Sequence, residues 1–481
     1  MSPLFHHRRL ATLALLAALP LLILGCANPN GAIPSQSLLL PPDKLEVSKT
    51  LKGVTVSEAH WPKEQWWSRY ADSQLDALLA EALAGTPSLR IAAARLRQAQ
   101  AMANIAEASD SIQANASLKD TRQRYSKHST IPSPLAGTWN TFNDTSLNLS
   151  YEFDFWGKNE ASIASSLDRL HAAEVDERAA QLMLTTGVIQ SYLHLAQFHD
   201  QLDLYQIILK QRQELLALTQ QRVVAGIDSQ VELKQAESAI PSARQQIAST
   251  REEIELTKNQ LSALLGKGPD RGLSLVRPMI KPQKFVGLPS VLPADLIGRR
   301  PDIVAMRWRA EAARQDIRVA RAQFMPNVSL LSFIGFQSLG FDQFINSGSR
   351  TLGIGPAISL PIFDGGRLRG NLGARNAEYD IAVEQYNQTV IGAVQDVVNQ
   401  LTSIRWHEEQ HEQQLIAVST AQTAYELAVQ RYRAGVGTYL QALTAELQLN
   451  AQKKVLLDIK TQALLLDANL IRSLGGSVLD V

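Results

Sequence analysis

The chain has 481 residues, and its 47 basic and 46 acidic side chains leave a net charge of +1. That balance gives no sign of the basic surface that nucleic acids require, so it argues against a nucleic-acid partner. Only 6% of the residues are aromatic, and Ala, Leu, Gln and Arg are abundant, which is typical of long helices. The length allows either several domains or one large repeated architecture.

The N-terminus has the pattern of a bacterial lipoprotein signal peptide, predicted over 1–25. Basic residues at His6–Arg9 precede an apolar run at Leu10–Gly25, which is too short for a comfortable transmembrane helix. The run ends in the letters ILGC, which resemble a lipobox, so Cys26 would become the acylated first residue of the mature protein. Because Cys26 is the only cysteine, a disulfide within one chain is excluded, and an incidental buried cysteine is the alternative. Ala27 follows it rather than Asp, which resembles the pattern of outer-membrane sorting.

Residues 26–60 are punctuated by Pro, Asn, Ser and Gly and are predicted to form an extended tether. A short helix with an aromatic entry, Trp61–Leu83, opens a first repeat at 61–268. A helix at Pro87–Ile112 follows, and its counterpart in a second copy is Pro301–Pro326. Proline begins both helices, at a position where its missing N–H costs nothing.

Strand-like segments come next in each copy. Ser146–Trp156 alternates strictly between apolar and polar residues over about ten positions, the length of a strand that crosses a bilayer in a barrel. Leu352–Ile362 alternates in the same way, although Pro356 on its apolar face weakens the pattern. Fainter partner strands are predicted near Ala114–Lys119 and Val328–Phe336. A two-stranded hairpin packed on a soluble core is the alternative.

The connections within the strand pairs, Asp120–Thr145 and Gln337–Thr351, are predicted to be irregular external loops. A bilayer tolerates strands only in a closed barrel, and the smallest single-chain barrels have about eight strands. With about four strands per chain, the protein should therefore oligomerise, and a dimer or a trimer would both close the barrel. Polar residues would line its interior as a water-filled channel: Ser146, Asn148, Ser150 and Glu152.

A long helix and a return helix follow each strand pair. The first runs from Lys158 to about Arg222 without a proline, which corresponds to about 95 Å. Its return helix is predicted at Ser229–Leu265, with a kink at Pro241. The second pair is predicted at Gly366–Arg433 and Thr438–Leu474. Helices of this length suit a protein that crosses the periplasm.

The two hairpin turns carry matching signals. A glycine able to adopt the left-handed conformation closes one helix, and a hydroxyl residue with Glu or Gln three positions later forms a capping box for the next. The two sets are Gly226, Ser229 and Glu232 in the first turn and Gly435, Thr438 and Gln441 in the second. Gly226 recurs as Gly435, 209 positions later, which indicates an internal duplication.

Together these segments resemble the outer-membrane efflux factors of the TolC/NodT type. The specific pieces are the lipobox, WWSRYADSQLDALLAEAL, YEFDFWGKNEAS, GRRPDIVAMRWRAEAARQDIRVARAQFMPNVSL, LPIFDGGRLRG and the paired RxxAG turns. The resemblance implies an α+β membrane protein: a homotrimer whose outer-membrane β-barrel, four strands per chain and twelve in total, continues as a long periplasmic α-helical tunnel. It also implies docking to a periplasmic adaptor (membrane fusion) protein and an inner-membrane efflux transporter, with no chemistry and no cofactor in the channel itself.

The resemblance places the chain in the outer membrane, lipid-anchored and extending into the periplasm, where it would passively conduct exported small molecules. The domains expected are the signal peptide 1–25, the tether 26–60, the first repeat 61–268, a linker 269–297, the second repeat 298–475 and a tail 476–481.

In this family the tunnel narrows just after the second RxxAG turn. Carried over by position, Leu440 would contribute an apolar ring, with ordinary helix packing as its alternative. Gln441 and Thr444 stand where some members place acidic residues, so the constriction is expected to be apolar and neutral. The turns around Gly226, Ser229, Gly435 and Thr438 would face the adaptor.

Two rival functions come from other classes. His407 to His411 reads HEEQH, a zinc-protease pattern, but a catalytic zinc needs a third ligand and an open position. The polar surroundings, RWHEEQHEQQ, favour a solvated helix face and no metal site. A passive periplasmic coiled-coil scaffold is the other rival, and it predicts no barrel.

Overall fold

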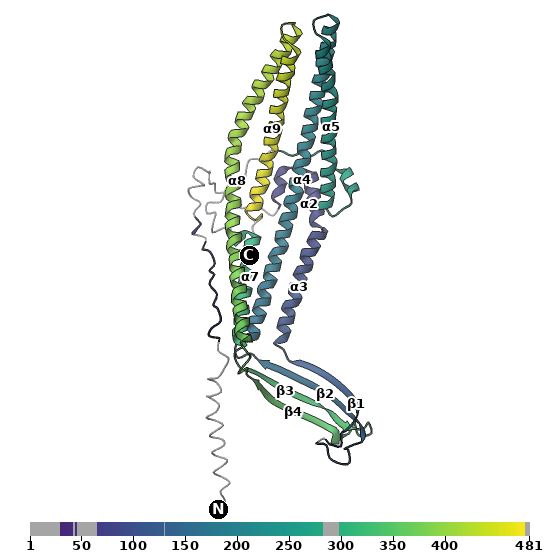
Figure 1. The fold of residues 1–481 in the computed structure, drawn as a ribbon, viewed down its shortest axis with the longest axis vertical. Helices are drawn as coiled ribbons and strands as arrows, with labels where there is room; N and C mark the ends of the chain where they lie inside the picture. The colour runs from purple at the N-terminus through teal and green to yellow at the C-terminus, as the bar shows by residue number, and fades with distance from the viewer. Residues whose placement is uncertain (1–28, 42–43, 46–64, 129, 282–297, 477–481) are drawn as a thin grey trace, which may run out of the picture. The chain divides into compact units, whose positions relative to one another are not determined.

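The computed structural model describes residues 29–41, 44–45, 65–128, 130–281 and 298–476. Cys26, the predicted signal peptide and 477–481 lie outside these ranges. Figure 1 shows the helices and strands along the chain. The chain divides into two units. The strand unit takes its residues from 1–39, 95–173 and 305–386, and the hairpin unit takes its residues from 40–94, 174–304 and 387–481.

Four long helices form two hairpins of equal dimensions. They are α4 (Lys158–Val224), α5 (Gln230–Leu264), α8 (Arg367–Arg433) and α9 (Tyr439–Ser473). α4 and α8 each have 67 residues, and α5 and α9 each have 35. The predicted long helices are confirmed, with boundaries that differ by at most two residues. α5 continues past Pro241 as one helix.

Shorter helices precede the strands and the second repeat. They are the 3₁₀ helix η2 (Trp66–Tyr70), α2 (Ser73–Leu83), α3 (Pro87–Ser109), the 3₁₀ helix η3 (Pro269–Ser274) and α7 (Pro301–Ala322). The prediction of one helix over Trp61–Leu83 is wrong, because Ala71 adopts a left-handed φ of 50°. Asp72 then caps α2 by accepting hydrogen bonds from the backbone N–H groups of Gln74 and Leu75.

A four-stranded antiparallel sheet lies in the strand unit, in the order β1-β2-β3-β4. The strands are β1 (Gln113–Arg124), β2 (Trp139–Phe153), β3 (Asn327–Leu339) and β4 (Arg350–Ser359), with a 3₁₀ turn η4 (Ser347–Ser349) before β4. The predicted irregular loop over Asp120–Thr145 is too long, since β1 and β2 pair as far as Arg124 and Trp139 and only the residues between these two lie outside the strands. Polar residues occupy both faces there, so hydropathy gives no alternation to detect. β4 ends at Ser359, three residues before the predicted Ile362.

The register aligns apolar side chains on one face of the sheet, although Ser332 interrupts one row and Leu331 and Phe333 lie on the opposite face. Leu147 pairs with Ile334, which pairs in turn with Leu352, so all three lie on one apolar face. On the opposite face the Ser117 and Ser146 hydroxyls lie 2.9 Å apart. A sheet with one apolar and one polar face suits a barrel wall with lipid outside and water inside. Among the helices of the described ranges, none is long and apolar enough to span a membrane.

Each unit has its own apolar core. In the strand unit, Ile317 and Phe324 of α7 pack with Leu368 and Leu372 of α8. In the hairpin unit, η2 and α2 pack against α4 and α5, and the fully buried members include Tyr70, Leu78, Tyr192 and Leu261.

Part of the predicted tether is fixed along α8. The Asp380 carboxylate accepts hydrogen bonds from the backbone N–H of Gln36 and Ser37 and, at 2.7 Å, from the hydroxyl of Ser35. One turn earlier, the Asn376 amide donates to the Ile33 carbonyl at 2.6 Å. An extended segment with no regular structure of its own therefore satisfies its backbone through helix side chains.

Candidate functional site

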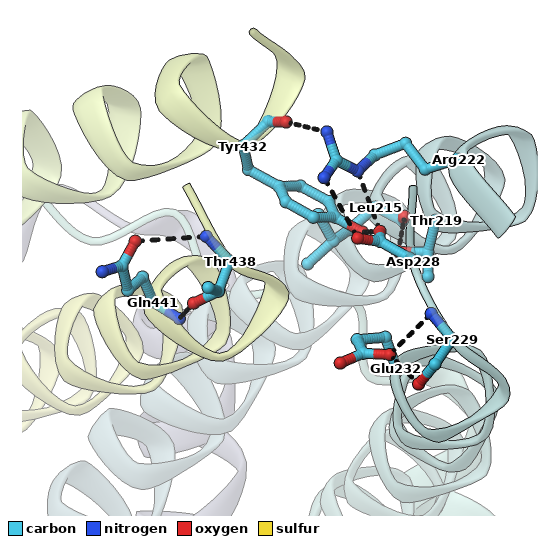
Figure 2. A network of polar contacts seen from close by, with 9 residues as sticks. All are labelled: Leu215, Thr219, Arg222, Asp228, Ser229, Glu232, Tyr432, Thr438 and Gln441. Carbon is cyan, nitrogen blue, oxygen red and sulfur yellow. Dashed lines mark hydrogen bonds and ion pairs between the residues drawn. The ribbon is translucent and has the colours of Figure 1, made fainter. Parts of the chain in front are cut away.

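Both hairpin turns of the hairpin unit follow the predicted capping pattern. Gly226 and Gly435 have φ values of 68° and 80°, the left-handed region where glycine carries no Cβ penalty. Ser229 forms a capping box with Glu232, and Thr438 forms one with Gln441 (Figure 2). The glycines and caps therefore fix where each return helix begins.

Arg222 links the two turns. Its guanidinium donates two hydrogen bonds to the Asp228 carboxylate, at 2.8 and 3.0 Å, and a third to the backbone carbonyl of Tyr432 at 2.6 Å. The arginine is only 7% exposed. Its Cζ atom lies 4.3 Å from the centroid of the Tyr432 ring, within the range of a cation–π contact.

Tyr432, from the end of α8, completes this network (Figure 2). Its hydroxyl donates to Asp228 and lies 2.9 Å from the Thr219 hydroxyl, and its side chain is fully buried. Burial raises the pKa of Tyr432 to about 12, and the hydrogen bond to Asp228 adds to the rise. The Arg222 hydrogen bond lowers the pKa of Asp228, although burial opposes it. At neutral pH the network therefore has one cation, one anion and one neutral donor.

A second polar link joins the hairpins further along the helices. Arg212 of α4 donates to Glu446 of α9 at 2.9 Å and to the backbone carbonyl of Ala239 in α5 at 3.0 Å. Glu446 is fully buried, and Asn450 also donates to it. One ion pair thus ties three helices together in a dry environment, where loss of either partner is costly.

The structure brings the three predicted constriction residues together. Leu440, Gln441 and Thr444 line one mainly apolar recess of about 530 Å³ between α8 and α9. Leu440 is 62% exposed, and the Thr444 hydroxyl donates back to the Leu440 carbonyl at 2.8 Å. No carboxylate lines the recess within the described residues, so its surface is neutral.

The HEEQH segment shows a structural role for its first histidine. His407 is only 7% exposed, and its Nε2 atom donates to the Ile459 carbonyl of α9 at 2.7 Å. The expectation of a fully solvated face is therefore wrong for His407, since the helix turns this residue toward its partner. The described part of the chain contains no group of three His, Cys, Asp or Glu residues placed to hold a metal.

Sequence reasoning missed the residues that connect the hairpins. Three of them stand where the two repeats differ. At the 209-residue offset, Asp228 corresponds to Gly437, Arg212 to Ala421 and Tyr432 to Val223, whereas Arg222 and Glu446 have identical counterparts. Polar residues that break an otherwise preserved duplication are the signal that could have pointed to them.

Comparison with known proteins identifies the family. Residues 78–267 and 292–476 match the family described as Outer membrane efflux protein. The chain belongs to this outer membrane efflux protein family. It is 31% identical over 486 residues to the multidrug resistance outer membrane protein MdtP of Escherichia coli K12. That alignment covers 98% of this chain and 97% of MdtP. It is 40% identical over 371 residues to the fusaric acid resistance protein FusA of Burkholderia cepacia, covering 76% and 69% respectively.

Solved structures agree with this assignment. The crystal structure of the outer membrane protein VceC from Vibrio cholerae is similar with a TM-score of 0.82 and 37% identity, over 87% of this chain and 100% of that one. The Campylobacter jejuni outer membrane channel CmeC, at 22% identity, shares the fold with a TM-score of 0.85, over 92% of this chain and 95% of that one.

Family membership confirms the predicted fold class and function. The outer membrane efflux proteins are trimeric outer-membrane channels with a β-barrel and a helical tunnel, and four strands per chain give twelve in the trimer. The chain is an outer-membrane efflux channel and not an enzyme. The scaffold and metallopeptidase alternatives are therefore wrong.

Proposed function

We propose that the hairpin turns form the periplasmic aperture of this channel and the surface that an adaptor protein contacts. In this proposal an inner-membrane transporter supplies the cargo and the energy, while the channel conducts passively. The observation that carries it is the pair of capped turns joined by Arg222, Asp228 and Tyr432, because an aperture needs a defined resting geometry. Gly226, Ser229, Gly435 and Thr438 would lie at the adaptor contact, and Figure 2 shows the two capping residues, Ser229 and Thr438.

Leu440, Gln441 and Thr444 would form the constriction. Their shared recess is apolar and its leucine is exposed, which supports a ring of three leucines in the trimer. The names of FusA and MdtP refer to fusaric acid resistance and multidrug resistance. They support small organic molecules of varied chemistry as the cargo.

Conductance tests the aperture directly. Leu440→Ala should raise the single-channel conductance of the purified trimer in planar bilayers several-fold, because it removes most of the apolar ring. Leu447→Ala is the matched control, because Leu447 is also exposed, at 52%, and lies on α9 outside the recess. Unchanged conductance in Leu440→Ala trimers that assemble normally would contradict the proposal that Leu440 forms the constriction.

Cys26 would carry the lipid anchor. Ala32 packs against the apolar cluster at the start of α8. It lies six positions after Cys26, which is at most roughly 20 Å of extended chain. The acyl groups would then reach the membrane beside the helix-side ends of the strands. Metabolic labelling with palmitate should mark the wild-type protein and not Cys26→Ala; equal labelling of both would exclude this site.

A further inference from the structure

The apolar face of the sheet becomes basic at the strand ends farthest from the helices. Successive residues of a strand alternate between its faces, so Arg122 and Arg124 share the β1 face of Ala116 and Leu118. The register extends this assignment to β2, because Ala116 pairs with Leu147 of the apolar row. Both arginines are exposed, and Asp120 separates them from the apolar part of the face.

β4 contributes a third arginine to the same face. Arg350 begins β4 two residues before Leu352, and it is exposed. Trp139 of β2 pairs with Arg124 and is 63% exposed. Within the described residues, no ion pair involves Arg122, Arg124 or Arg350, and Arg124 makes one hydrogen bond, to the Gly137 carbonyl at 3.2 Å. Asp120 is the one carboxylate on this row of β1.

Closure of the barrel brings these groups together. β1 and β4 are the two edges of the sheet, so β4 of one copy lies beside β1 of the next in the trimer. Each seam then carries Arg350 from one copy with Arg122 and Arg124 from its neighbour. The opposite end of the face is different in kind: Phe153 stacks on Phe155 with ring centroids 5.8 Å apart, as in the aromatic girdle of a barrel.

A charged side chain on a lipid-facing surface is costly at the bilayer midplane and tolerated near the headgroups. The three arginines therefore mark the headgroup level of the outer leaflet. Guanidinium groups bind phosphate through two parallel hydrogen bonds, and the exposed indole of Trp139 suits an interface that is apolar on one side and polar on the other. Three unpaired cations with one acid among them are complementary to a polyanionic headgroup.

We propose that Arg122, Arg124 and Arg350 form a seam site for lipopolysaccharide, the phosphorylated glycolipid of the outer leaflet, and bind its phosphate groups. The site rests on the orientation in the proposed function, with the helices in the periplasm and the strand connections outside. It would fix the barrel to its surrounding lipid and brace each junction between copies.

The experiment uses the full-length trimer in detergent, delipidated and mixed with rough-type lipopolysaccharide. Native mass spectrometry counts the bound glycolipid. The test variant is the triple change Arg122→Gln, Arg124→Gln and Arg350→Gln. The matched control removes three exposed helix arginines, through Arg97→Gln, Arg244→Gln and Arg251→Gln. A third variant replaces the three strand arginines by lysine, and dephosphorylated lipid A and phosphatidylglycerol serve as comparison lipids.

Wild type and the helix control should bind lipopolysaccharide equally. The affinity of the strand triple variant should be lower by at least about tenfold, since each lost bond to a charged phosphate contributes to affinity. Lysine should restore part of that loss, and the dephosphorylated lipid should bind wild type weakly. Equal binding by the strand variant, or equal binding of dephosphorylated lipid A or phosphatidylglycerol to wild type, would overturn the site.

Conductance in a bilayer without lipopolysaccharide should be the same for wild type and the strand variant. A failure of wild type itself to conduct would instead contradict the proposed function.

Discussion

Tyr432 joins two turns that lie about two hundred residues apart in the chain. Its carbonyl accepts from Arg222 and its hydroxyl donates to Asp228, so one residue is bonded to the end of α4 and to the turn that follows. The bidentate contact between Arg222 and Asp228 orients both groups toward it. A small chemical change at Tyr432 should therefore weaken the connection between the two hairpins while both hairpins stay folded.

Tyr432→Phe is the smallest such change. It keeps the ring and the backbone contact and removes a hydrogen bond to a charged acceptor, which is worth about 1.5–3 kcal/mol. We expect a more open aperture and a several-fold higher single-channel conductance. Tyr439→Phe is the control, because the Tyr439 ring is buried beside that of Tyr432 and its hydroxyl makes no hydrogen bond to the described residues. Equal conductance in both variants would show that the network does not hold the aperture.

The pH dependence of the same network follows from its pKa shifts. The pKa of Asp228 is lowered from 3.8, so its contribution to stability is present above that value and is lost as the pH falls through the lowered pKa. The pKa of Tyr432 is raised from 10.0 to about 12, so its contribution is present below 10 and is lost as the pH rises toward 12.

We therefore expect the conductance ratio of Tyr432→Phe to wild type to stay constant between about pH 5 and pH 9. The ratio should fall toward one only at more acidic or more alkaline pH. Taking the ratio cancels titration elsewhere in the channel. A ratio that changes near pH 6 or 7 would mean that another group controls the aperture.

The ion pair of Arg212 and Glu446 is a deeply buried link between helices of the two hairpins, with side chains 8% and 0% exposed. Arg212→Ala would leave a fully buried carboxylate without its partner, at a cost of about 3–5 kcal/mol. Thermal unfolding of the purified protein should show a clear loss. The double change Arg212→Met and Glu446→Leu should cost much less, since it removes both charges.

The duplication supplies the control for that experiment. Glu237 corresponds to Glu446 at the 209-residue offset, but it pairs with Lys234 on the surface, where the two side chains are 39% and 70% exposed. Glu237→Ala should therefore change stability by at most about 1 kcal/mol. A similar loss for Glu237→Ala and Arg212→Ala would show that burial does not set the strength of these pairs.

The secondary structure was largely predictable because its signals are local. Capping boxes, left-handed glycines and helical periodicity set the ends of α4, α5, α8 and α9 to within two residues. The strands were harder to predict, since β1 and the outer half of β2 carry polar residues on both faces. The bonds between Arg222 and Tyr432, and between Arg212 and Glu446, were not predictable, because they depend on how two distant hairpins pack. The grouping of Leu440, Gln441 and Thr444 at one site could be predicted only from their positions in the sequence after the second turn.

For the molecule as a whole, one ancestral unit has been used twice and then differentiated. Both copies keep the strand pair and the hairpin, which together build the barrel wall and the tunnel wall. The copies diverge where they meet: Asp228 and Arg212 come from the first copy, and Tyr432 and Glu446 come from the second. The difference that separates the copies at the ion pair is Arg212 against Ala421, since the glutamate is present in both as Glu237 and Glu446.

The equal helix lengths restrict how such a chain can evolve. α4 and α8 both have 67 residues, and α5 and α9 both have 35. Deleting two helical turns from α4 and two from α5 would withdraw the first turn by about 11 Å, well beyond the reach of Arg222 to Tyr432. A lineage could therefore adapt to a thinner or thicker periplasm only by matched insertions or deletions in all four helices, and changes in tunnel length should be inherited as coordinated events in both repeats.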